Sequence, residues 1–215
     1  MTLALTAPSP PPPYPSRHSG KGIGRRHSEY YAEDGNLSIL VSGTLFRVWT
    51  GLFRAPHSLA FGKQYPGLDA TDDASPLRFD ASVTDKDFEK FLWVLNPRVI
   101  GEFRTQTVDD WVTVLRLSSL WEFVAIRNLA IERLGSLKID PVRKIVIHLQ
   151  YKIGPEWAFD AFDALCRRRE PLNMDEGRDV AVEVVTKVAT AREALSKTWS
   201  KPESVVQRVW FTGTA

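Results

Sequence analysis

Residues 34–48 have the sequence DGNLSILVSGTLFRV. The runs 37–41 and 44–49 are rich in aliphatic, β-branched and aromatic residues, which favour strands. Only Ser42 and Gly43 separate the two runs, and a two-residue connection of this kind is typical of a tight turn between antiparallel strands. The stretch therefore predicts a β-hairpin.

Helical patterns take over beyond the hairpin. Residues 77–80 (LRFD) predict a short third strand, and Thr84 is a good helix N-cap because Asp85 and Asp87 lie in the turn that follows it. Four apolar residues then recur at i, i+3, i+4 and i+7, which predicts one buried helical face. These residues are Phe88, Phe91, Leu92 and Leu95.

The rest of the chain carries helix signals rather than strand patterns. Thr107 is a second N-cap, Asp140-Pro141 is a helix-start signature, and Gly154-Pro155 interrupts the pattern. We expect helices over residues 108–118, 121–134, 142–151 and 157–167, and one long last helix that ends near Leu195. Strands come first and helices follow, so the predicted class is α+β with helices dominating.

Composition and pattern divide the chain into four segments. We expect a disordered proline-rich leader (1–27), a domain of strands and helices (28–136), a C-terminal helical extension (137–195) and a flexible tail (196–215). Six of the 14 prolines lie in the first 15 residues, and Pro8–Pro15 is expected to be extended polyproline. Such a segment is either a plain leader or a ligand for SH3 or WW domains.

Charge and composition argue against several classes of protein. The first 28 residues have four basic side chains and no acidic one, which leaves 24 basic and 26 acidic side chains in the remainder. The slightly acidic remainder argues against direct binding of nucleic acid. No apolar run approaches the roughly 18 residues that cross a bilayer, and a single cysteine excludes an intramolecular disulfide framework. We expect the protein in the cytoplasm, the nucleus or both.

Residue types that could carry chemistry have plainer explanations. The histidines, which lack a ligand partner at i+3 or i+4, are His18, His27, His57 and His148. Glycines 20, 22 and 24 lack the strand, helix and hydroxyl residue of a phosphate loop. Paired aspartates are expected to cap helices and turns, Cys166 to be buried and inert, and the seven tryptophans to fill the core or anchor interfaces. We assign no catalytic, metal-binding or cofactor-binding residue, and the interface residues stay unknown.

The order of these elements resembles the BTB/POZ domain, and specifically the BTB-type proteins abundant in basidiomycete fungi. The resemblance covers about residues 28–195 and rests on the order and spacing of several short motifs. These are DGNLSILV (34–41), TLFRV (44–48), PLRFD (76–80), DFEKFLWVLNP (87–97), TVDDW (107–111), the stretch 115–131 and the stretch 139–192. It implies a short three-stranded sheet with a helical cluster, followed by a C-terminal helical extension.

Two departures from the family pattern affect these expectations. The family usually has His-Arg after the second strand, where this chain has Trp49 and Thr50, and Pro56 would disturb the interior of the helix expected there. We therefore expect residues 49–66 to be remodelled or, alternatively, to be a decayed segment. Many BTB domains also homodimerise through a helix and a strand ahead of the first core strand. The proline-rich leader occupies that position, so the usual homodimer is doubtful.

The resemblance implies a non-enzymatic protein–protein interaction module and, more specifically, a substrate adaptor for a cullin-type ubiquitin ligase. The implied partners are proteins, either a cullin scaffold or another BTB domain, and no cofactor is implied. An alternative is an oligomerisation or recruitment module of a transcription-associated protein. A remote alternative is an enzyme whose site is assembled from scattered residues.

Overall fold

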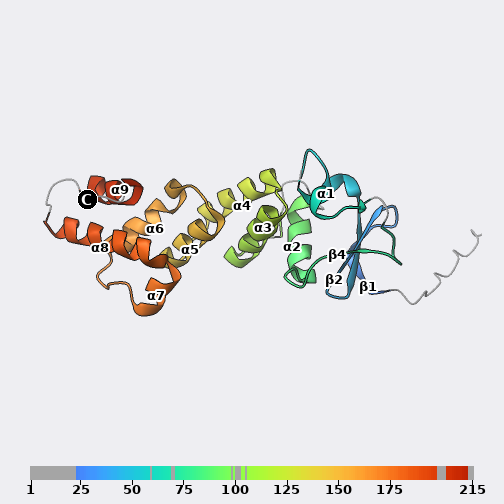
Figure 1. Ribbon diagram of the computed structural model, residues 1–215, viewed down its shortest axis with the longest axis horizontal. Helices are drawn as coiled ribbons and strands as arrows, with labels where there is room; N and C mark the ends of the chain where they lie inside the picture. The colour runs from blue at the N-terminus through green and yellow to red at the C-terminus, as the bar shows by residue number, and fades with distance from the viewer. Residues whose placement is uncertain are drawn as a thin grey trace, which may run out of the picture.

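The computed structural model describes residues 23–58, 60–68, 71–97, 99, 103–104, 106–197 and 202–212. Strands lie at one end of an elongated molecule, and the last helices, α8 (Ala181–Lys197) and α9 (Pro202–Thr212), lie at the other (Figure 1). A four-stranded mixed sheet comes first in the chain and helices follow it. This arrangement confirms the predicted α+β class. The expected polyproline segment lies outside the described residues.

The predicted hairpin forms the centre of the sheet, whose strand order is β1-β3-β2-β4. β2 (Leu37–Val41) and β3 (Thr44–Val48) are antiparallel. Ser42 and Gly43 both have positive φ, which is the backbone conformation that a two-residue hairpin turn needs. β4 (Leu77–Arg78) pairs with β2 in parallel and supplies the predicted third strand.

A fourth strand precedes the hairpin, so the expectation of three strands is wrong. β1 (Arg25–Tyr31) begins inside the predicted leader and lies parallel to β3 at the edge of the sheet. The backbone N–H of Arg25 donates to the carbonyl of Gly43, and that of Ala32 donates to the carbonyl of Arg47. β1 buries only Tyr30 and has no alternating apolar pattern, which is why periodicity does not reveal it.

Residues 49–66 form two short helices on either side of Pro56. η1 (Thr50–Phe53) is a 3-10 helix, and α1 (Phe61–Gln64) is a single α-helical turn. Pro56 lies between them and therefore interrupts no helical hydrogen bond. Phe53 and Phe61 are completely buried. The segment is thus an ordered part of the core.

Both predicted threonine caps are confirmed. Thr84 precedes α2 (Asp85–Leu95), Thr107 precedes α3 (Val108–Leu120), and each hydroxyl accepts the backbone N–H of an aspartate three residues later. Each aspartate accepts the threonine N–H in return, which completes a capping box. The predicted apolar face of α2 packs into the core. Phe88, Phe91 and Leu92 are completely buried, and Leu95 is half-buried.

Helices α4 (Val124–Ser136), α5 (Pro141–Tyr151) and α6 (Pro155–Arg167) occupy the predicted regions. Asp140 caps α5 as expected, because its carboxylate accepts the N–H groups of the second and third helical residues. The predicted long last helix is instead two helices, α7 (Met174–Asp179) and α8. Val180 separates them, and Ala181, the first residue of α8, has a φ of 68°, so the backbone leaves the right-handed helical conformation at the start of α8.

Helix α9 lies within the predicted flexible tail, so that expectation is wrong for residues 202–212. Val206, Val209 and Trp210 are buried, and they pack in one cluster with α5, α6 and α8. The Trp210 indole stacks on Phe162 at a ring-centroid distance of 4.6 Å, and its N–H donates to the Pro155 carbonyl at 2.8 Å. The apolar residues of α9 are confined to residues 205–211, about two helical turns, which is too short for a firm sequence pattern.

The buried side chains form three clusters along the molecule. The first joins the sheet to α1, α2 and the α3–α4 turn, the second joins α2, α3, α4 and α5, and the third joins α5, α6, α8 and α9. Among the described residues, no helix has the length and apolar character that crossing a membrane requires.

We expect Trp210→Ala to lower the free energy of unfolding by about 3–5 kcal/mol, because loss of the indole leaves a cavity in the core and removes a hydrogen bond. The matched control is Phe211→Ala, which changes a neighbouring side chain that is 42% exposed. It should lower the free energy of unfolding by about 1 kcal/mol. Chemical denaturation of both variants measures the difference. Equal, small effects would show that α9 does not pack as described.

Candidate interaction surface

The described histidines come from different elements of the fold, and His27 has a structural role. The Nδ1 atom of His27 accepts the backbone N–H groups of Glu29 and Tyr30, each at 3.1 Å, and the ring stacks on Phe46. His57 is exposed, and His18 lies outside the described residues. Burial lowers the pKa of His148. Its Nδ1 atom is buried, and no described residue forms a hydrogen bond with it.

The cysteine and the carboxylates also serve the fold. Burial, followed by the nearby Asp163 carboxylate, raises the pKa of Cys166 to about 12, so the thiol is not a nucleophile at neutral pH. Asp72 accepts the backbone N–H groups of a tight turn at Ala74 and Ser75. In the part of the chain that the structure describes, no three His, Cys, Asp or Glu residues are placed to hold a metal ion.

Most of the basic run 167–169 forms hydrogen bonds and ion pairs within the molecule. Arg167 donates to Asp163, and Arg168 donates to both carboxylate oxygens of Glu176 at 2.8 and 2.5 Å. Arg192 of α8 donates to the carbonyls of Leu165 and of the residues just after it, at the C-terminus of α6. The run therefore joins α6 to α7 and α8, as expected for cations at a helix C-terminus.

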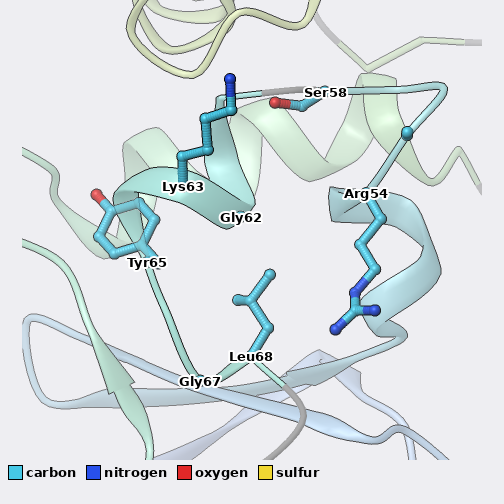
Figure 2. A pocket seen from close by; sticks show the side chains of 8 residues that line it. Arg54, Ser58, Gly62, Lys63, Tyr65, Gly67 and Leu68 are labelled. Carbon is cyan, nitrogen blue, oxygen red and sulfur yellow. The ribbon is translucent and has the colours of Figure 1, made fainter.

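A hollow lies between η1, α1 and the loop after α1. Its volume is about 340 Å³, and it is open to solvent. Leu68 points into the hollow, with Arg54 on one side and Tyr65 on the other, while Lys63 points away from it (Figure 2). The arrangement offers a small apolar floor with a basic rim.

The α3–α4 turn is tied directly to this hollow. The Ser58 hydroxyl donates to the Trp121 carbonyl at 2.6 Å, and the Trp121 indole N–H donates to the Tyr65 hydroxyl at 3.4 Å. On either side of the completely buried Trp121, Leu120 is 41% exposed and Val124 is 64% exposed. We call the hollow together with Leu120 and Val124 the η1–α4 surface. It combines two exposed aliphatic side chains with a rigid, hydrogen-bonded frame.

The charged residues that the structure describes at the hollow are basic. Arg54 and Lys63 are exposed there, and none of the described residues that line it is acidic. Burial raises the pKa of Tyr65, despite the hydrogen bond from Trp121, so its hydroxyl stays protonated at neutral pH. A partner with an aliphatic side chain and nearby acidic groups would match these features.

The tryptophans divide between core and surface. Trp111, Trp121 and Trp210 are buried, and Trp157 donates its indole N–H to the Ile131 carbonyl at 3.1 Å. Trp49 is 39% exposed and is the one tryptophan among the described residues that is classed with the exposed apolar side chains. The sequence left the interface residues unassigned because exposure is not visible in a pattern. The only signal for Leu120 and Val124 was their place beside a helix junction.

No protein-family model matches the chain, and no curated protein matches it either.

We expect acid to destabilise the wild-type chain through Glu176. Hydrogen bonds from Arg168, then the backbone N–H of Asn173, lower the pKa of this carboxyl from 4.5 to about 2. A lowered pKa contributes stability that is complete above the unfolded value and is lost as pH falls from about 4.5 to 2. The stability advantage of wild type over Glu176→Gln should therefore shrink across that window, as urea denaturation at several pH values would show.

Glu132→Gln is the matched control for this titration. Glu132 is exposed and has no ion-pair partner among the described residues, so its loss should leave the pH dependence of unfolding unchanged. A parallel pH dependence for Glu176→Gln and wild type would contradict the assigned ion pair.

Proposed function

We propose that this protein is a protein–protein interaction module of the BTB/POZ type that binds its partner through the η1–α4 surface. The observation that carries the proposal is the pair of exposed aliphatic side chains, Leu120 and Val124, at the turn whose Trp121 carbonyl accepts a hydrogen bond from Ser58 of the open hollow. Apolar side chains that remain exposed next to a concave site are typical of binding surfaces. The order of hairpin, short third strand and helices, which resembles BTB/POZ domains, supports the choice of family.

The rigidity of the surface supports a binding role. Ser58, Tyr65 and Trp121 are joined by hydrogen bonds, so the side chains around the hollow are held in place before a partner arrives. Binding to a preorganised surface loses little conformational entropy, which favours affinity. The small size of the hollow favours a protein side chain over a whole small-molecule substrate.

The specific form of the proposal is an adaptor that recruits substrates to a cullin-type ubiquitin ligase. In this form the η1–α4 surface binds the cullin scaffold, and the helices from α5 onward enlarge the contact or receive the substrate. The exposed cations Arg54 and Lys63 would attract an acidic patch on the scaffold. Recruitment in a transcription-associated complex would use the same surface with another protein partner.

We expect the full-length chain to form a complex with a cullin N-terminal domain, and light scattering coupled to gel filtration measures its mass and stoichiometry. Val124→Asp should weaken that complex at least about tenfold, because a carboxylate replaces an exposed apolar contact of the surface. Calorimetry or interferometry on the full-length variants gives the affinity ratio.

Val182→Asp is the matched control for Val124→Asp. Val182 is 80% exposed and also lies in the first turn of a helix, α8, at the opposite end of the molecule (Figure 1). It should leave cullin binding unchanged. A mass that does not change on addition of the cullin would refute the ligase form of the proposal, and equal losses for both variants would refute the η1–α4 surface.

A further inference from the structure

A second, smaller hollow lies between the ends of β1 and β3 and the end of α2. Its volume is about 200 Å³. The buried residues Tyr30 and Val48 line it, together with the exposed ring of Trp49 and the half-buried Pro97. We call this site the Trp49 pocket. It is separate from the η1–α4 surface and shares no lining residue with it.

The chemistry of the Trp49 pocket suits a polyproline segment. Grooves that bind polyproline present aromatic rings to flat proline rings, and they present donors to proline carbonyls, which have no N–H partner of their own. Here Trp49 supplies the exposed ring, and the buried Tyr30 forms part of the wall. The Asn96 side-chain amide lies on the rim, and no described residue pairs with it. The Trp49 indole N–H is held only loosely, at 3.4 Å from an Asp34 carboxylate oxygen.

The chain itself carries such a segment. This segment is Pro8–Pro15 (PSPPPPYP), and its last residue lies eight positions before Ile23. An extended chain of eight residues spans about 28 Å. From Ile23 to Tyr30 the chain rises about 23 Å along β1. The leader is therefore long enough to return along the exposed edge of β1 and to place its proline run on the pocket.

Charge is compatible with this return path. The connection from the proline run to β1 contains Arg17 and Lys21 and no acidic residue. Near the pocket, the carboxylates of Glu29 and Asp34 are balanced by Arg47, which lines the pocket, and by Arg104, which pairs with Glu29 at 2.7 Å. Charge therefore does not oppose the docked arrangement, and a short tether gives an effective concentration of about millimolar.

We propose that the Trp49 pocket is a polyproline-binding site and that residues 8–15 of the same molecule occupy it. The leader is then a built-in ligand of the domain. Because the tether raises the local concentration, a weak site of this size is sufficient to hold the segment. A proline-rich segment of another protein would have to displace the leader before it could bind.

Paramagnetic relaxation in the full-length chain tests this proposal. A nitroxide is attached at Ser9→Cys, and Cys166 does not compete for the label because it is buried with a pKa of about 12. The probe is the indole N–H signal of Trp49, which is identified by its loss in Trp49→Phe. The matched control carries the same label, with Pro10, Pro11, Pro12 and Pro13 all replaced by serine, so length and charge stay the same.

We expect the relaxation enhancement at Trp49 to be at least about threefold larger with the native leader than with the serine leader. Equal enhancements in the two chains would overturn the proposal, because chain tethering alone would then account for the effect. Mixing nitroxide-labelled chains with isotope-labelled chains should produce no enhancement. An enhancement in that mixture would overturn the intramolecular assignment and show that the leader docks on a second copy.

Discussion

The side chain of Trp121 holds the N-terminal half of the molecule together. It is completely buried, and its ring contacts Phe61, Phe79, Phe88 and Phe91 at centroid distances of 5.0 to 6.0 Å. These four rings come from α1, from the residues after β4 and from α2, so one indole joins three separate segments of chain. Its backbone carbonyl and its indole N–H are both used as well, by Ser58 and Tyr65. Trp121 therefore holds together the segments that form the η1–α4 surface.

The elements that the sequence predicts correctly are held by interactions between residues close together in the chain. The Ser42-Gly43 turn and the threonine caps of α2 and α3 follow from backbone conformation and from hydrogen bonds within four residues. β1 and α9 did not follow, because each is held by partners far along the chain. β1 depends on the backbone of β3, and α9 depends on Phe162 and on the Pro155 carbonyl. The residue pattern of one segment does not show which distant residues will pack against it.

The sequence predicted neither candidate site, for a related reason. Trp49 was noticed as a departure from the family pattern, but its exposure and the pocket beside it depend on β1, which the pattern did not reveal. Leu120 and Val124 are aliphatic residues like those of the core, and only packing shows that they remain outside. Which apolar side chains stay exposed, and so form a binding surface, depends on the tertiary packing.

Helix α5 links the two helical clusters, with different faces in each. Ile147 belongs to the cluster of α3 and α4, while Val142 and Ile145 belong to the cluster of α6, α8 and α9. Along the same helix, Lys144 is 7% exposed and donates to both carboxylate oxygens of Asp160 at 2.7 Å. Because its charge is paired, this lysine can lie within the apolar junction between α5 and α6.

The elongated shape that follows from three clusters in series also has a consequence for assembly (Figure 1). A sphere of the same mass would bring all of its binding surfaces within a short distance of one another. In this chain the sheet end and the α8–α9 end are separated by stacked helices. On the binding role proposed above, a partner at the sheet end would leave the α8–α9 end unobstructed.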